Sequence, residues 1–239
     1  MYLKNNSSET YDFITKNHIP WSLVPSSLET QKKFHEEVVQ TDFIKNFYDN
    51  SDFTINNFIK AVNLDSRRHK TIIYITGKCY PMIARQAEFM KKNGFKTYLI
   101  SMETLSEQNV KMIKDSFDEI IQTCFFFPTL GKIIKSVSPS FFHVQCWMWQ
   151  YSLGKFVIEK NIKSKVISDF YDVTGMYSNF DGLNMVFSKE IIEDDYENEK
   201  FIFENSDGII HRYKQRVFND YAKKYKKTAK YLEFQQYSI

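Results

Sequence analysis

The stretch from Lys70 to Met102 constrains the fold most, because a strand, a helix and a second strand fit within it. Residues 71–76 form an unbroken apolar, β-branched run closed by Gly77. Such a run, without polar alternation, is typical of a strand buried on both faces, as in a parallel sheet. After Pro81 the apolar side chains recur at helical spacing until Asn93-Gly94 supplies a stop, and residues 95–100 predict the second strand. The stretch therefore predicts a right-handed βαβ unit.

The alternation continues to the end of the chain. Predicted strands cover residues 119–122, 141–145, 165–170, 209–211 and 230–234, and predicted helices or loops cover residues 107–115, 128–137, 147–161, 188–204 and 214–224. Six or seven strands alternating with helices indicate an α/β fold with a doubly wound, mostly parallel, Rossmann-like sheet. We assign residues 70–239 to this domain.

Residues 1–69 lack the alternation and predict an N-terminal helical extension. Ser26-Ser27-Leu28-Glu29 fits a capping box, and apolar residues at three- and four-residue steps predict a helix ending near Tyr48. A second short helix is expected over residues 53–64, followed by a charged linker at residues 65–70. The extension either covers the sheet or serves as a substrate lid or partner-docking element.

Composition places the chain among ordinary globular proteins. Its 239 residues are 43% hydrophobic, and a net charge of +3 gives no reason to expect nucleic acid as a partner. The three cysteines share no CxxC spacing, so neither a disulfide framework nor a zinc site is indicated. No apolar run approaches the roughly 20 residues that span a bilayer, and the polar start is no signal peptide. We expect a cytoplasmic protein, at most peripheral at a membrane.

The turn after the first strand lacks the usual phosphate-binding fingerprints. Gly77-Lys-Cys-Tyr-Pro81 holds one glycine and matches neither GxGxxG nor GxxxxGK[ST]. Lys78 at this strand end could meet an anion or remain a solvated lysine. HExxH, EF-hand and GxSxG motifs are absent as well, so the sequence supports neither a metal site nor serine-hydrolase chemistry.

Candidate functional residues follow two later strands, at the edge where parallel sheets gather chemistry. His143 stands near the end of the strand at 141–145, as a catalytic group or as a hydrogen-bonded core residue. Trp147 could stack on a sugar face or pack in the core. Tyr171 and Asp172 follow the strand at 165–170, and Asp172 could act as a base, bind a sugar hydroxyl or cap a turn. We interpret Asp169 as a structural residue.

Four segments in order resemble the acceptor-side, N-terminal domain of GT-B glycosyltransferases of the family-4-like type. They are ARQAEFMKKNGFKTYLIS, FFHVQCWMWQ, VISDFYDVTG and EKFIFENSDGIIHRYKQRVF. His143 matches the family's histidine, Tyr171-Asp172 stands at its usual histidine-aspartate pair, and the last segment places Glu204, Asp207 and His211 at family positions. The resemblance covers roughly residues 70–239.

The resemblance implies transfer of a sugar from a nucleotide-sugar donor to a glycan or lipid-linked acceptor. The donor is a co-substrate, and no further cofactor or metal is expected. His143 and Asp172 would be catalytic, while Gly77, Lys78, Trp147 and Tyr171 would contact substrate. The donor site belongs to a second Rossmann domain, which a longer parent chain, a partner chain or self-association would supply.

Two other functions stay open. The domain could be a non-catalytic binding or scaffolding module that kept the fold without the chemistry. It could also be a small α/β enzyme acting on nucleotide sugars or phosphosugars at the same sheet edge. The basic, aromatic segment 223–231 is either an anionic-membrane contact or the solvated end of a helix.

Overall fold

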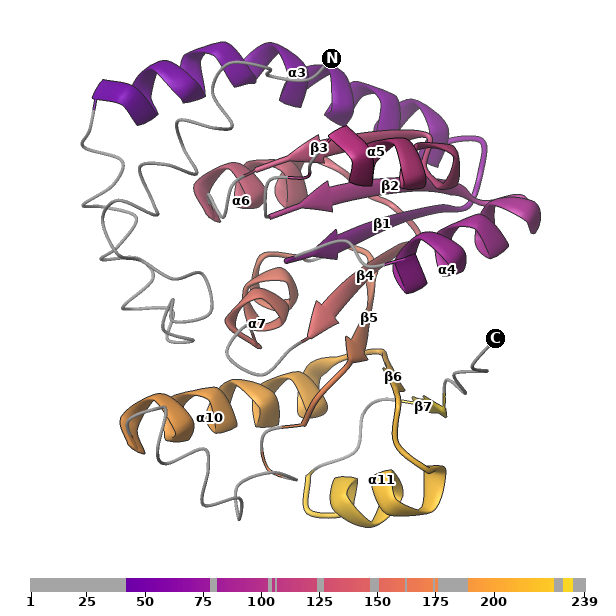
Figure 1. Cartoon of the computed structure of the whole chain (residues 1–239), viewed down its shortest axis with the longest axis vertical. Coiled ribbons are helices and arrows are strands. Elements are labelled where there is room, and N and C mark those ends of the chain that lie inside the picture. The colour runs from indigo at the N-terminus through magenta and orange to yellow at the C-terminus, as the bar shows by residue number, and fades with distance from the viewer. Residues whose placement is uncertain are drawn as a thin grey trace.

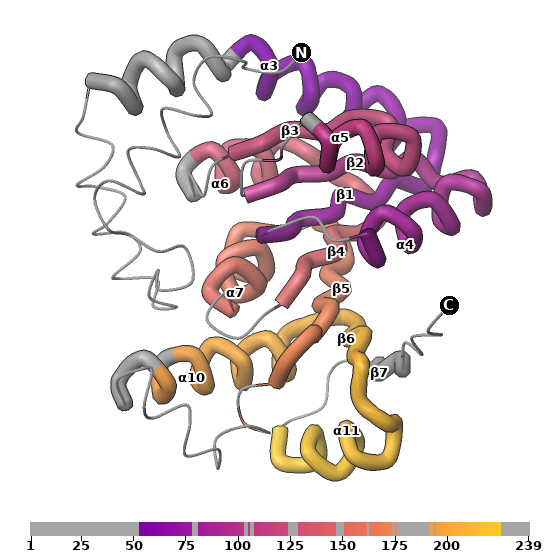
Figure 2. The backbone as a smooth tube through the Cα atoms, in the orientation of Figure 1, coloured from indigo at the N-terminus to yellow at the C-terminus, as the bar shows by residue number. Residues whose placement is uncertain are grey.

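The chain forms one parallel β-sheet flanked by helices (Figures 1 and 2). The computed structural model describes residues 42–77, 81–102, 105, 107–123, 127–146, 151–161, 163–173, 175, 189–225 and 230–233. Seven strands lie within these residues in the order β3-β2-β1-β4-β5-β6-β7, and every neighbouring pair is parallel. The strands are β1 (Thr71–Thr76), β2 (Lys96–Ser101), β3 (Glu119–Gln122), β4 (Phe141–Cys146), β5 (Lys165–Phe170), β6 (Gly208–His211) and β7 (Lys230–Glu233).

The strand order confirms the predicted doubly wound, Rossmann-like α/β fold. β1 lies between β2 and β4, so the chain winds outward in one direction through β3 and in the other through β7. Ligands of such sheets bind outside the carboxyl ends of the strands, where the winding reverses. The connecting helices are α3 (Asp42–Ser66), α4 (Pro81–Lys92), α5 (Glu107–Ile113), α6 (Phe127–Ser136), α7 (Tyr151–Lys160), α10 (Lys189–Asn205) and α11 (Gln215–Ala222), with a 3₁₀ turn η2 (Lys114–Ser116).

Different sets of helices cover the two faces of the sheet. Successive side chains of a strand point to opposite faces, so alternate residues of β1 belong to two separate cores. Ile72 and Tyr74 pack in a smaller core with α4 and α5. Ile73 and Ile75 belong to a larger core that receives buried residues from α3, α6, α7, α10 and α11. In Figure 1, α3 lies at the β3 end of the sheet and α11 at the β6 end.

The predicted stop after α4 is confirmed. Gly94 has a φ of 83°, a left-handed conformation that costs glycine little. Its N–H bonds the Lys91 carbonyl, and the Phe95 N–H bonds the Met90 carbonyl at 3.1 Å. This pair of bonds is a Schellman motif, which ends the helix and turns the chain into β2.

The N-terminal extension differs from expectation, because α3 is one helix of 25 residues. The predicted end near Tyr48 and the separate helix at 53–64 are wrong, and the expected linker starts later because α3 runs to Ser66. Residues 49–52, between the two predicted helices, are polar, but they include neither glycine nor proline to end a helix. Ile55, Phe58 and Val62 form a buried stripe that packs α3 onto the larger core. The predicted capping box lies outside the described residues.

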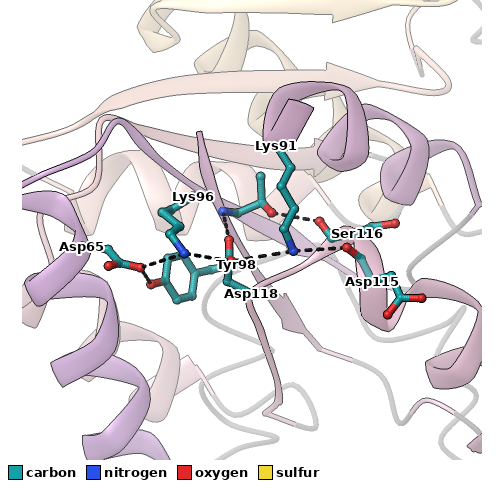
Figure 3. Close-up of polar contacts among 8 residues, drawn as sticks. Asp65, Lys91, Lys96, Tyr98, Asp115, Ser116 and Asp118 are labelled. Carbon is teal, nitrogen blue, oxygen red and sulfur yellow. Dashed lines mark hydrogen bonds and ion pairs between the residues drawn. The ribbon is translucent and has the colours of Figure 1, made fainter. Parts of the chain in front are cut away.

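A polar network at the amino-terminal edge of the sheet ties α3 to β2 (Figure 3). The Tyr98 hydroxyl donates to Asp65 Oδ2 at 2.6 Å, and Lys96 Nζ lies 3.1 Å from Asp118 Oδ1. The Thr97 N–H donates to Asp118 Oδ2 at 2.9 Å. Burial, followed by the bond to Asp65, raises the pKa of Tyr98 far above that of an exposed tyrosine, so its hydroxyl remains a donor. Polar contacts therefore stabilise this edge, which lies opposite the carboxyl ends of the strands.

Among the helices in the described ranges, none combines the length and the apolar character needed to cross a bilayer.

Candidate functional site

Asp169 of β5 is the centre of a buried polar cluster near the carboxyl ends of the strands. Its carboxylate is fully buried. His143 Nε2 of β4 lies 3.0 Å from Oδ2, and Gln86 Nε2 of α4 donates to the same oxygen at 3.3 Å. Arg212 makes a two-pronged contact, with Nη1 2.8 Å from Oδ1 and Nη2 donating to Oδ2 at 2.9 Å. We call Asp169, His143, Arg212 and Gln86 the Asp169 cluster.

Strand register brings these residues together. Gln145 of β4 pairs with Asp169 of β5, so His143, two residues earlier on β4, projects from the same face of the sheet as Asp169. β6 is the next strand beyond β5, and its Ile210 pairs with Asp169, so Arg212 follows two residues later at the start of the loop after β6.

The partners keep the Asp169 carboxylate ionised. Burial alone would raise the pKa of Asp169, but the hydrogen bond and charge of His143, together with the charge of Arg212, lower it below the ordinary aspartate value. The Arg212 guanidinium also lies over the Tyr171 ring, 4.6 Å from its centroid, a cation–π contact. Charge in this cluster is therefore compensated within the protein.

His143 lies inside the sheet layer. Its residue is 6% exposed, and its ring lies 4.7 Å from the ring of Tyr74 on β1. β4 continues for three further residues, to Cys146. His143 thus contacts the cluster with one ring nitrogen and packs against an aromatic neighbour with its face.

The loop after β5 presents Asp172 beyond this cluster. The Tyr151 hydroxyl of α7 donates to the Asp172 carbonyl oxygen, and the Val173 N–H donates to the Tyr213 hydroxyl at 3.0 Å. The Gly175 N–H donates to Glu199 Oε2 of α10 at 3.2 Å. Partial burial raises the pKa of the Asp172 carboxyl above its ordinary value. The backbone around Asp172 is therefore held by side chains from three separate parts of the chain.

The other sequence-predicted site residues have different positions. Tyr171 follows β5 and lies under Arg212, so the structure brings it together with His143 through the Asp169 cluster. Gly77 is buried directly after β1, at the reversal of the winding. Lys78 and Trp147 lie outside the described residues. Within the described part of the chain, no three His, Cys, Asp or Glu side chains are grouped to share a metal ion.

The family positions at the end of the domain are partly structural. Asp207 Oδ2 accepts the Val166 N–H at 2.8 Å, which fixes the turn at the amino end of β6. His211, at the opposite end of β6, is buried with its ring stacked 3.7 Å from that of Phe218. Glu204 is partly buried on α10. Asp207 therefore lies at the edge away from Asp172.

Sequence reasoning missed Arg212 and Gln86. An available signal for Arg212 was its place directly after a predicted strand, the position from which His143 and Asp172 were chosen. Gln86 carried no such signal, because its role depends on how α4 lies across the sheet.

Comparisons with known proteins do not assign this chain to a family. No family model matches the sequence, and no curated protein matches it. A mutant O-GlcNAc transferase from Thermobaculum terrenum superposes with a TM-score of 0.42 and 10% identity, covering 72% of this chain and 29% of the transferase. A short-chain dehydrogenase/reductase from Burkholderia vietnamiensis superposes with a TM-score of 0.33 and 7% identity, covering 71% of this chain and 84% of that protein. The chain thus corresponds to less than a third of the transferase's length.

Proposed function

We propose that this chain is the acceptor-binding domain of a GT-B-type glycosyltransferase, in which Asp172 binds the acceptor hydroxyl and takes its proton. In that reaction the acceptor oxygen bonds the anomeric carbon of the donor sugar as its O–H proton passes to the carboxylate. The bond from the anomeric carbon to the nucleoside diphosphate breaks, and the diphosphate leaves. A second domain or partner chain would supply the donor.

The observation that carries the proposal is the Asp172 carboxyl, held at the carboxyl edge of a doubly wound sheet by a loop anchored through three hydrogen bonds. A catalytic base must be positioned before it reacts, and anchoring of the backbone provides this. Partial burial also raises the pKa of Asp172, which makes its carboxylate a stronger base than an exposed aspartate.

In this proposal His143 has a structural role beside the site. Its bond to Asp169, which also holds Arg212, joins β4 to β5, the strand directly before the loop that carries Asp172. A non-catalytic binding module is the second candidate, and the same cluster favours it, because His143, Asp169 and Arg212 satisfy one another.

We expect Asp172→Asn to weaken acceptor binding by roughly tenfold or more, the effect of losing a hydrogen bond to a charged group. The measurement is thermal stabilisation of the purified chain by a panel of oligosaccharides, followed by titration calorimetry of those that bind. UDP-glucose, UDP-N-acetylglucosamine and GDP-mannose form a parallel panel and should give no shift. Asp220→Asn is the control, since this carboxylate is exposed on α11 and pairs with Lys223.

Other outcomes have distinct meanings. A sugar-nucleotide shift that disappears in Asp172→Asn would show that this chain binds donor itself, contrary to the proposed acceptor role. Glycan binding unaffected by Asp172→Asn would remove Asp172 from the site. No shift in either panel would favour the binding-module function.

A further inference from the structure

We infer that Glu199 of α10 is a positioning residue for Asp172, acting through the Gly175 amide. The inference rests on the proposed function for the importance it gives Asp172. Its structural basis is a second buried cluster formed by Glu199, Tyr221, Tyr225 and Gly175, distinct from the Asp169 cluster.

The Glu199 carboxylate joins three segments of the chain. Its Oε2 accepts the Gly175 N–H at 3.2 Å, at the end of the loop that carries Asp172. Its Oε1 accepts the hydroxyls of Tyr221, on α11, and Tyr225, just beyond α11; the Tyr225 bond measures 3.0 Å. The two hydroxyls lie 2.9 Å apart. Glu199 is fully buried, so these donors replace the water that its carboxyl group would otherwise bind.

The space around Gly175 allows little displacement of the loop. A Cβ atom at this position would lie 1.8 Å from the Tyr221 hydroxyl oxygen and 2.8 Å from a ring carbon of Tyr196. No side chain fits unless the Tyr221 and Tyr196 side chains or the loop move. Gly175 is therefore held by a hydrogen bond on one side and by close packing on the other.

Lys224 closes the outer side of the cluster. Its Nζ lies 3.8 Å from the centroid of the Tyr221 ring and donates to the Tyr196 hydroxyl at 2.9 Å. Cation–π contact and the hydrogen bond keep both rings in place. The Tyr221 hydroxyl is thus constrained from two directions as it bonds Glu199.

Only a short segment of the chain separates Gly175, which Glu199 holds, from Asp172. Gly175 is three residues beyond Asp172, and Val173 between them is anchored by Tyr213. Loosening of Gly175 would let the loop move, so the Asp172 carboxyl would become more exposed to water. Burial is the cause of the raised pKa of Asp172, so this pKa reports on the loop position without any substrate.

The test compares Glu199→Gln with Glu197→Gln, a substitution on the same helix whose carboxylate is exposed. We expect the Gly175 amide of Glu199→Gln to exchange its hydrogen roughly two- to tenfold faster, because the amide group that replaces the carboxyl group has one acceptor oxygen in place of two. We also expect the pKa of Asp172, followed by carbon NMR of labelled aspartate carboxyls, to fall toward its ordinary value. Glu197→Gln should change neither quantity.

Tyr221→Phe is a milder second variant in case Glu199→Gln does not fold. It removes one donor to Glu199 while keeping the ring, and should change exchange and titration in the same direction. Unchanged Gly175 exchange and unchanged Asp172 titration in a folded variant would overturn the inference. The proposed function fails separately, if glycan binding does not respond to Asp172→Asn, and that result would leave the exchange and titration outcomes standing.

Discussion

Asp169→Asn is expected to lower the free energy of unfolding by about 3–5 kcal/mol, the usual cost of breaking a buried ion pair by removing one partner. The Arg212 guanidinium would remain, with its side chain 11% exposed, without the charge that offsets its desolvation. The new amide group would also direct N–H donors toward Arg212 and His143, which are donors themselves. Urea denaturation followed by circular dichroism measures the change.

The control is again Asp220→Asn, which removes an exposed carboxylate and should change stability by no more than about 0.5 kcal/mol. In the double variant Asp169→Asn with Arg212→Met, the cost should be smaller than the sum of the single costs, because the buried cation is removed together with its carboxylate. A cost for Asp169→Asn as small as that of Asp220→Asn would show that the buried ion pair does not stabilise the fold.

The same cluster sets a dependence on pH. The pKa of Asp169 is lowered by folding, so the folded state binds fewer protons than the unfolded state, and stability rises with pH. Its contribution is complete above the unfolded aspartate pKa of about 3.9 and is lost as the pH falls toward the folded value. Asp169→Asn should therefore show a shallower loss of stability in acid than the wild-type chain.

The sheet could be predicted from local sequence because each strand contains at least two adjacent apolar residues. β1, β3 and β5 have the predicted bounds, and each contains a pair of adjacent β-branched residues. The stop after α4 was equally local, because a left-handed residue is needed and Gly94 provides it. The continuity of α3 could not be predicted from local sequence. Its polar middle belongs to one helix whose later turns are buried against the sheet.

The candidate site was likewise predictable from the sequence only in part. The position of Asp172 after a strand could be read from the sequence, because carboxyl ends of parallel strands share one edge. The Asp169 cluster joins α4, β4, β5 and the loop after β6, and no spacing in the sequence connects Gln86 with Arg212. The Glu199 cluster was hidden for a related reason: the acidic start of α10 is typical of a solvated helix, and burial of Glu199 follows from the packing of α11.

Phe203→Ala is expected to lower the free energy of unfolding by about 3–5 kcal/mol, because a fully buried phenylalanine would leave a cavity. The Phe203 ring contacts Phe170 of β5 at 4.8 Å between centroids, Phe218 at 5.5 Å and Tyr225 at 4.7 Å. It thus packs α10 and α11 against the end of the sheet. Urea denaturation measures the cost, and Val217→Ala, on the half-exposed face of α11, serves as control.

Phe203→Ala should also loosen the loop that carries Asp172, because the Phe203 ring packs against the tyrosines that bind Glu199. Phe203 lies 5.9 Å from the Tyr221 ring as well as against Tyr225, so its removal allows both hydroxyls to move away from the carboxylate. We therefore expect faster exchange of the Gly175 amide in Phe203→Ala, beyond the increase that reduced global stability produces in the core strands. Phe203→Leu, which fills most of the volume, should cost about 1.5 kcal/mol or less and leave Gly175 protected. Equal acceleration at Gly175 and in the core strands would show that the aromatic packing stabilises the domain without positioning the loop.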